Sequence, residues 1–177
     1  MQPNKITVPE TKPATEWVRG RPLQKVSPKY AHAVLQGAIV SALRAWARGR
    51  GRVGTEWRFY VAPPGEQARP LVPDIAYLSY ERLPQRDVEA AQEPMMAPDA
   101  AVEILSPSDR RVDVEDKIDV YLRSGAGVVV LVDPAKRKFV AQTNKDSRQF
   151  IERDVFEHET LPDFQLDVAE LFAELER

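Results

Sequence analysis

The first clear element in the hydrophobic pattern is a helix. Apolar side chains recur at three- and four-residue spacing along residues 31–48, which is the pattern of one buried helix face; they are Val34, Leu35, Ala38, Ile39, Ala42, Leu43 and Trp46. Ser27 and Pro28 precede this segment as a cap and a first-turn proline. Gly49 and Gly51 follow it. We therefore predict a helix that ends at these glycines.

Strand patterns flank this helix. Residues 16–23 suggest a short strand, a glycine turn and a return strand. Residues 53–61 alternate apolar and polar positions, which is typical of a half-buried strand. Residues 71–79 are a second apolar strand, and Pro73 favours its start or a sheet edge.

A strand–helix–strand unit occupies the middle of the chain. Residues 100–105 and 127–132 are almost entirely apolar, as in strands covered on both faces. Between them, 109–124 carries the helical spacing of Val114, Ile118, Tyr121 and Leu122. We expect the two strands to be parallel and joined by a right-handed crossover.

The remaining segments are shorter. Residues 80–99 form an irregular excursion with a possible helix at 86–92. Residues 138–143 and 149–156 are predicted to be a strand pair. A turn at 161–163 leads into a C-terminal helix over 167–175.

These elements predict an α/β fold, a mixed β-sheet flanked by helices. The chain has 177 residues, which suits one domain. Residues 1–15 are polar and contain prolines, and we expect them to be a flexible N-terminal arm. The single domain is then 16–177.

Composition excludes several classes of function. With no cysteine, disulfides, thiolate catalysis and Cys-ligated zinc are ruled out. No apolar run reaches the length of a membrane span, about 18 residues, and the N-terminus has no apolar signal core. We expect a cytoplasmic protein with no membrane partner. The net charge of −2 shows that the protein as a whole is not a polycation that binds DNA. The basic clusters at 44–52, 109–111 and 135–138 can contact phosphates, although each cluster alone is more typical of a solvated face.

Glu103 is the sharpest anomaly. An ionised carboxylate inside an apolar strand is costly unless a partner compensates its charge. A divalent cation is one such partner. A salt bridge to an arginine or to Lys117 is the equally weighted alternative.

Asp74 and Lys117 are the other candidates. Asp74 also lies among apolar strand residues and meets Glu103 if the two strands are neighbours, although a Pro-Asp pair is common in turns. Lys117 lies beside the buried stripe of its helix, so its stem can deliver the ammonium group to the strand ends. The alternative is a surface pair with Asp113, four residues earlier.

Together these three residues could hydrolyse a phosphodiester bond with the help of a metal ion. Two carboxylates can hold Mg²⁺ or Mn²⁺, and the metal acidifies a water that attacks phosphorus. A lysine offsets the charge that builds up on the phosphate.

The order of motifs resembles the Uma-two family of restriction endonucleases, a branch of the PD-(D/E)XK nuclease superfamily. The matching pieces cover nearly the whole chain after residue 15; they are Glu16–Gly20, Ser27-Pro28 with His32, Val72–Ala76, Val102–Ser108, Asp113, Lys117, Tyr121, Gly127-Val128, Leu131–Pro134, Leu161–Phe164 and Glu170–Phe172. Each piece is weak alone, and the ordered set is fairly specific.

The resemblance implies a restriction-endonuclease-like core with Asp74 and Glu103 as the metal-binding acids. The superfamily pattern places a lysine two residues after the second acid, where this chain has Leu105, and Lys117 takes that role from the next helix. The implied protein is a Mg²⁺- or Mn²⁺-dependent endonuclease that acts on DNA, expected as a homodimer. Glu16 and His32 also match family positions, as an extra acid or arginine partner and as a group that orders the site.

Two other classes of function remain open. A catalytically inactive nucleic-acid-binding or interaction module could use the same fold. A plain assembly protein would explain the apolar strands through a dimer interface.

Overall fold

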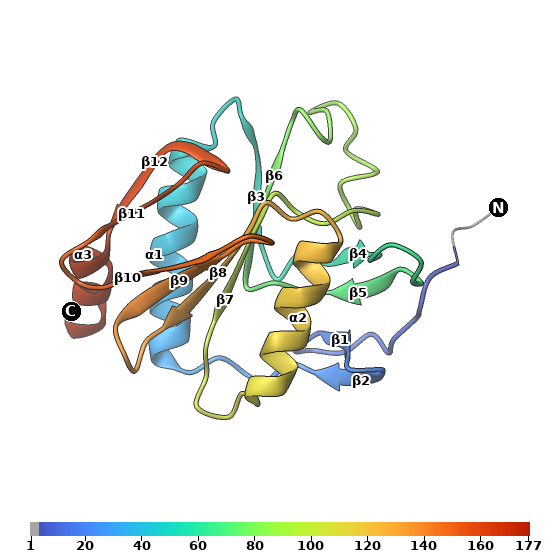
Figure 1. The fold of residues 1–177 in the computed structure, drawn as a ribbon, viewed down its shortest axis with the longest axis horizontal. Coiled ribbons are helices and arrows are strands. Elements are labelled where there is room, and N and C mark those ends of the chain that lie inside the picture. Colours follow the sequence, from blue (N-terminus) through green and yellow to red (C-terminus); the bar gives the residue numbers. More distant parts are fainter. Residues whose placement is uncertain (1–3) are drawn as a thin grey trace.

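The computed structural model describes residues 4–177 and is built around a six-stranded sheet (Figure 1). Its strand order is β10-β9-β8-β7-β6-β3, and the bounds are β3 (Gly51–Thr55), β6 (Ile75–Ser79), β7 (Ala100–Ile104), β8 (Val128–Asp133), β9 (Lys138–Gln142) and β10 (Ser147–Phe150). Only the β7–β8 pair is parallel among these neighbours. The predicted mixed sheet and the parallel crossover between 100–105 and 127–132 are confirmed.

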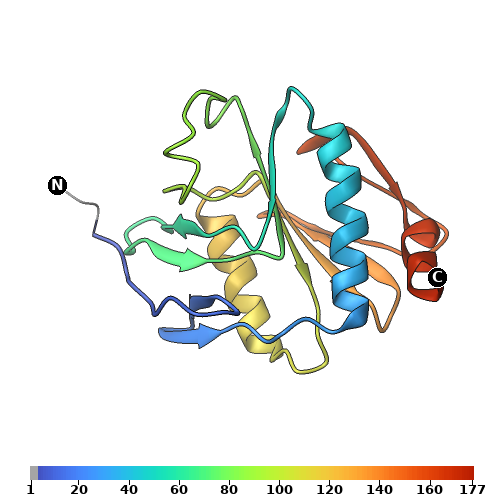
Figure 2. The same cartoon turned by 180° about the vertical axis from the view of Figure 1, so that it is seen from behind.

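Helices cover both faces of this sheet. In Figures 1 and 2, α1 (Tyr30–Trp46) lies on one face and α2 (Arg111–Arg123) on the other. Side chains alternate between the faces along a strand, so in β7 Val102 packs in the core of Leu35 on α1, whereas Ala101 packs in the core of Tyr121 on α2. Glu103 shares the α2 face with Ala101.

Three two-stranded hairpins complete the fold, and their bounds are β1 (Thr15–Val18) with β2 (Arg21–Gln24), β4 (Phe59–Val61) with β5 (Arg69–Leu71), and β11 (Val155–His158) with β12 (Leu161–Asp167). The first two hairpins add Val18 and Phe59 to the core beneath α2. The third adds Phe156 to the core beneath α1, next to α3 (Val168–Ala173) and its 3₁₀ extension η1 (Glu174–Glu176).

Two predicted strands are each divided in the structure. The strand expected over 53–61 is wrong as one element, because the chain leaves the central sheet at Glu56, where φ is +48°, and then pairs Phe59 with Leu71. The strand expected over 71–79 is likewise split, since Pro73 has no N–H for a ladder. Asp74 therefore lies in the bend before β6, not inside a strand.

Element ends show further differences. Ser27 does not cap α1, whose N-cap is Lys29 without a side-chain bond. The helix expected at 86–92 is a series of turns. This excursion is held by the Arg52 guanidinium, which donates to three backbone carbonyls between Leu83 and Gln85.

The C-terminal pattern also pairs differently from the expectation. Residues 149–156 belong to two strands, because β10 pairs with β9 and β11 pairs with β12. Strand β12 was not predicted from the sequence, because its Leu-Pro-Asp start is typical of a turn. Its Phe164 is nevertheless buried.

The N-terminal segment runs along the β4–β5 hairpin. Ile6 donates its N–H to the carbonyl of Ala68, and Glu10 pairs with Arg58. Residues 1–3 lie outside the described residues, and flexibility of the 1–15 arm stays a prediction.

Candidate functional site

Asp74, in the bend before β6, lies beside β7, the strand that carries Glu103, because the two strands are neighbours as the sequence reading required. Strands β6 and β7 are antiparallel neighbours, with Ile75 opposite Val102. This register brings the carboxylate of Asp74 to the end of β7, where its Oδ2 accepts a 2.7 Å hydrogen bond from the N–H of Ile104. The two acids therefore belong to one site.

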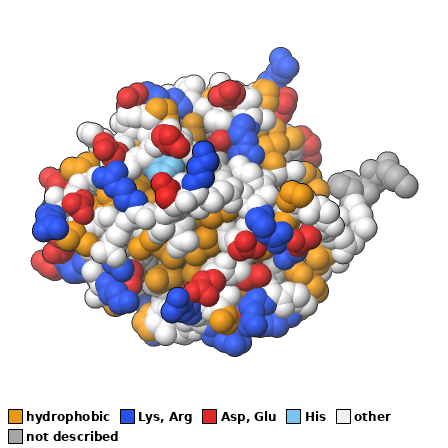
Figure 3. Space-filling view, in the orientation of Figure 1, with side chains coloured by type: hydrophobic (Ala, Val, Ile, Leu, Met, Phe, Trp, Pro, Cys, Tyr) orange, Lys and Arg blue, Asp and Glu red, His pale blue; other side chains and the backbone are white. Residues whose placement is uncertain are grey.

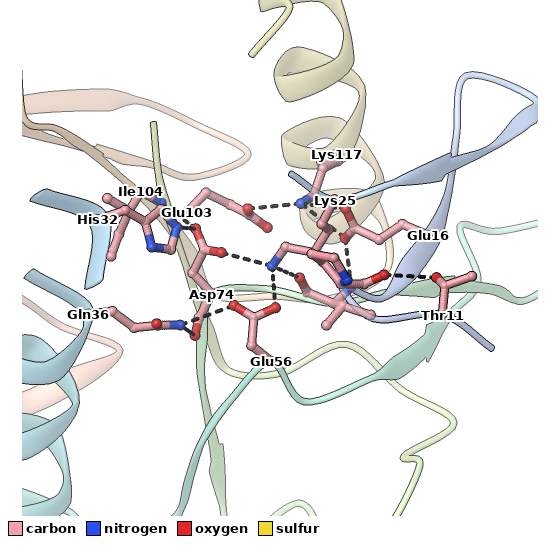
Figure 4. A network of polar contacts seen from close by, with 12 residues as sticks. Thr11, Glu16, Lys25, His32, Gln36, Glu56, Asp74, Glu103, Ile104 and Lys117 are labelled. Carbon is pink, nitrogen blue, oxygen red and sulfur yellow. Dashed lines mark hydrogen bonds and ion pairs between the residues drawn. The ribbon is translucent and has the colours of Figure 1, made fainter. Parts of the chain in front are cut away.

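Lys117 joins them from the helix above. Its Nζ lies 2.8 Å from Oε2 of Glu103, since both residues face the space between β7 and α2. Asp74, Glu103 and Lys117 line the same cavity of about 770 Å³. The structure thus brings together all three predicted residues (Figure 4).

Glu16 supplies another buried carboxylate from β1. Both of its oxygens lie 3.0 Å from Nζ of Lys117, and one accepts a 2.7 Å bond from the N–H of Val72. Its partner is therefore a lysine and not the arginine that was considered. Glu16, Asp74, Glu103 and Lys117 are each less than 9% exposed.

Lys25 is a further component of the site that the sequence did not indicate. Its Nζ lies 2.8 Å from Oδ1 of Asp74, 2.7 Å from Oε2 of Glu56 and 2.9 Å from the carbonyl oxygen of Val72 (Figure 4). A single lysine after a short hairpin strand gives no sequence signal, because its partners lie about 30 to 50 residues away.

The helix α1 contributes two polar residues one turn apart. His32 Nε2 lies 3.1 Å from Oδ2 of Asp74, so His32 helps to orient the Asp74 carboxylate. Gln36 donates to the carbonyl of Asp74 at 2.8 Å and to Glu56 at 3.1 Å. The four-residue spacing places both side chains on the same face of α1.

Asp113 does not form the surface pair with Lys117 that was the alternative reading. It is buried and pairs with Arg21 at 3.2 Å, with Arg19 at 3.8 Å. Lys117 turns inward instead. Asp113 thus fastens the β1–β2 hairpin, which carries Glu16, to α2.

Comparison with known proteins identifies the family of this chain. Residues 4–169 match the Uma2 family, described as "Putative restriction endonuclease". The chain belongs to this family. A crystal structure of "a putative nuclease belonging to DUF820" from Anabaena variabilis ATCC 29413 superimposes with a TM-score of 0.84 at 27% identity, covering 95% of this chain and 94% of that one. No curated protein matches the chain.

Membership of the Uma2 family and the nuclease-like fold support a nuclease-type function. Within residues 4–177, no helix is both long and apolar enough to cross a membrane.

The buried charges of this Uma2 site shift one another's pKa values. Burial alone would raise the pKa of the Asp74 carboxyl, but the hydrogen bond from His32 and the charge of Lys25 hold it well below its usual range. Burial raises the pKa of Glu103 to about 8, against the attraction of Lys117. Burial lowers the pKa of Lys117, yet the charges of Glu103 and Glu16 outweigh this and raise it above its ordinary value. Lys117 therefore stays cationic, while Glu103 titrates near neutral pH.

The donor set suits a hard divalent cation, since it consists of carboxylate oxygens and one backbone carbonyl. In the described part of the chain, no three acidic or histidine side chains converge as a ready metal-binding group. The physical reason is that ammonium groups stand between the acids, Lys25 between Asp74 and Glu56, and Lys117 between Glu16 and Glu103. When all are ionised, four carboxylates and two ammonium groups leave a charge of −2, which one divalent cation would neutralise.

The second ring nitrogen of His32 is also buried. Nδ1 of His32 is buried and has no hydrogen-bond partner within residues 4–177. Because buried polar atoms are normally satisfied, this atom fits an ordered water.

Proposed function

We propose that this protein is a Mg²⁺- or Mn²⁺-dependent endonuclease that hydrolyses phosphodiester bonds in DNA. The observation that carries the proposal is the Lys117 ammonium group held between Glu16 and Glu103, in the same cavity as Asp74. An ordinary structural ion pair needs one acid for one lysine. Buried titratable groups with strongly shifted pKa values that share a cavity are candidates for a functional site.

Asp74 and Glu103 would hold the cation. When bound, such an ion acidifies a water and stabilises charge on a phosphate oxygen. Lys117 would orient Glu103 and offset charge that develops on the phosphate. Glu16 would keep the Lys117 ammonium beside Glu103, and His32 would fix the orientation of the Asp74 carboxylate.

A plasmid-nicking assay tests the catalytic role. With Mg²⁺ or Mn²⁺, we expect the wild type to nick supercoiled plasmid and Lys117→Ala to lose about 100-fold or more of that rate, as when one charge-stabilising group is removed. Lys136→Ala, at an exposed position outside the cavity, is the matched control and should nick like the wild type. A wild type that binds DNA but never cuts it would favour the inactive binding module.

Thermal denaturation tests metal binding independently of cleavage. We expect Mg²⁺ or Mn²⁺ to raise the melting temperature of the wild type, because a ligand that binds only the folded state stabilises it. The Glu103→Gln variant should show little of this shift, since the amide removes a carboxylate ligand. Equal shifts in both proteins would contradict the proposed ligand set.

DNA as substrate and a homodimeric state are parts of the same proposal. Figure 3 shows charges of both signs interspersed over the face viewed, in keeping with the net charge of −2. Binding therefore has to depend on local phosphate contacts near the cavity, such as Arg21 and Arg110 on its lining. Comparing single-stranded DNA, duplex DNA and RNA substrates, with light scattering for the oligomeric state, tests both parts.

A further inference from the structure

Lys25 has no role in the chemistry described so far, yet it is anchored to the acids of the site. Its ammonium group contacts Asp74, Glu56 and the carbonyl of Val72, all within 2.9 Å. Its side chain is 13% exposed, and that of Glu56 is 44% exposed. Lys25 therefore lies at the more open side of the acid cluster, where a solute would approach Asp74.

The oxygens around Lys25 include a carboxylate oxygen of Asp74, which would also hold the cation together with Glu103. Two carboxylates and a backbone carbonyl are hard oxygen ligands of the kind that bind Mg²⁺ and Mn²⁺. Here they surround the single positive charge of an ammonium group instead. In Figure 4 this group lies directly between Asp74 and Glu56.

Both oxygens of Asp74 already accept hydrogen bonds. Oδ2 lies next to the N–H of Ile104 and Nε2 of His32, and Oδ1 contacts Lys25. The N–H is fixed in the backbone and His32 is fixed on a long helix. Lys25 has a flexible four-carbon stem, so it is the donor that can leave.

We propose that Lys25 is an internal counter-cation of this site, whose ammonium group leaves Asp74 and Glu56 when a divalent cation binds. The Lys25 contacts and metal binding then exclude one another. Without the metal, Lys25 reduces the repulsion between the acids and keeps them in place. With the metal, its displacement opposes binding and raises the metal concentration that the enzyme needs. The inference rests on the proposed metal dependence.

Lysine reactivity in the wild-type chain tests the displacement directly. A brief pulse of N-hydroxysuccinimidyl acetate, read by mass spectrometry, should acetylate Lys25 several-fold more at saturating Mn²⁺ than without it. The exposed Lys29 and Lys136 serve as references and should not change. Saturation by Mn²⁺, checked by calorimetry, with unchanged or lower acetylation of Lys25 would overturn the inference and leave the proposed function standing.

Calorimetry of a variant gives a second measurement. Lys25→Met keeps the unbranched chain up to the position of Cε and removes the charged amine, and we expect it to lower the Kd for Mn²⁺ at least tenfold. Lys29→Met, with an equal charge change, should bind as the wild type does. A Kd that is unchanged or higher in Lys25→Met would overturn the inference. Failure of Mn²⁺ to bind either wild type or Lys25→Met would instead overturn both the inference and the proposed metal dependence. The acetylation test needs no variant, so it also decides the question if Lys25→Met does not fold.

Discussion

At the scale of single residues, Glu103 places a carboxylate, a group normally hydrated, at a buried strand position. It is buried on the α2 face of β7, with the Lys117 ammonium 2.8 Å from its Oε2. Tyr121 also points its hydroxyl to Glu103, 3.5 Å from Oε1. Desolvation nevertheless dominates, which is why its pKa rises to about 8. The residue is held in place by the fold at a cost in stability.

This shift predicts how stability depends on pH. The folded protein holds a proton on Glu103 up to about pH 8, whereas the unfolded chain releases it near pH 4.5. The folded state therefore binds more protons between these values, so the contribution of Glu103 to stability falls as pH rises through this window.

Urea unfolding at pH 5 and pH 8 checks the prediction against Glu103→Gln, which cannot ionise. The free energy of unfolding of the wild type, relative to the variant, should fall by on the order of 3 kcal/mol between the two pH values. The lowered pKa of Asp74 changes the free energy of unfolding only below about pH 4, outside this window. A difference that stays constant or grows with pH would show that Glu103 is ionised throughout.

At the scale of elements, the edge strand β3 depends on a glycine. Gly51 pairs with Ser79 of β6, and a Cβ at this position would meet the carbonyl oxygen of Leu78 at 2.5 Å and the ring of Tyr77 at 2.6 Å. The backbones approach here too closely for any side chain. The β3–β6 pair in turn positions the start of β6, next to Asp74.

Gly51→Ala should therefore destabilise the protein by about 1–3 kcal/mol, the usual cost of overpacking. Gly37→Ala is the matched control, because a Cβ on that face of α1 meets nothing within 4 Å. Alanine is the better helix former, so this control should be stabilised by up to about 1 kcal/mol. Chemical denaturation measures both changes, and equal effects at the two glycines would refute the close approach.

At the scale of the whole molecule, two cores share one sheet. One core lies between the sheet and α1, and Trp46 packs against it; the other lies between the sheet and α2, and Trp57 packs against it. Alternate residues of β7 and β8 enter opposite cores. Neither core can be lost without disrupting strands of the other.

We therefore expect both halves to unfold in one transition. Variants that keep a single tryptophan, Trp46 or Trp57, report each core by fluorescence in urea. In each variant, the urea midpoint of the fluorescence change should coincide with the midpoint for the loss of secondary structure, measured by circular dichroism. Separate midpoints within one variant would show two independent units.

The sequence by itself determined the parts of this protein that depend on local periodicity. The α1 and α2 helices, the apolar strands β7 and β8 and their parallel pairing follow from spacing and chain connectivity. Burial logic also singled out Glu103, because a carboxylate in an apolar strand needs a partner wherever it lies. The ordered motifs drew attention to Asp74 and Lys117.

Only the tertiary structure decided which of the candidate charge pairs of the site form. Lys25, Glu56 and Gln36 come from segments far apart in the chain, and nothing local distinguishes them from surface residues. The division of 53–61 and 71–79 into separate strands also depends on partners in another hairpin. Charged groups and strand edges pair with partners from remote segments of the chain. The distances between those segments are set by the fold, and the local sequence pattern does not encode them.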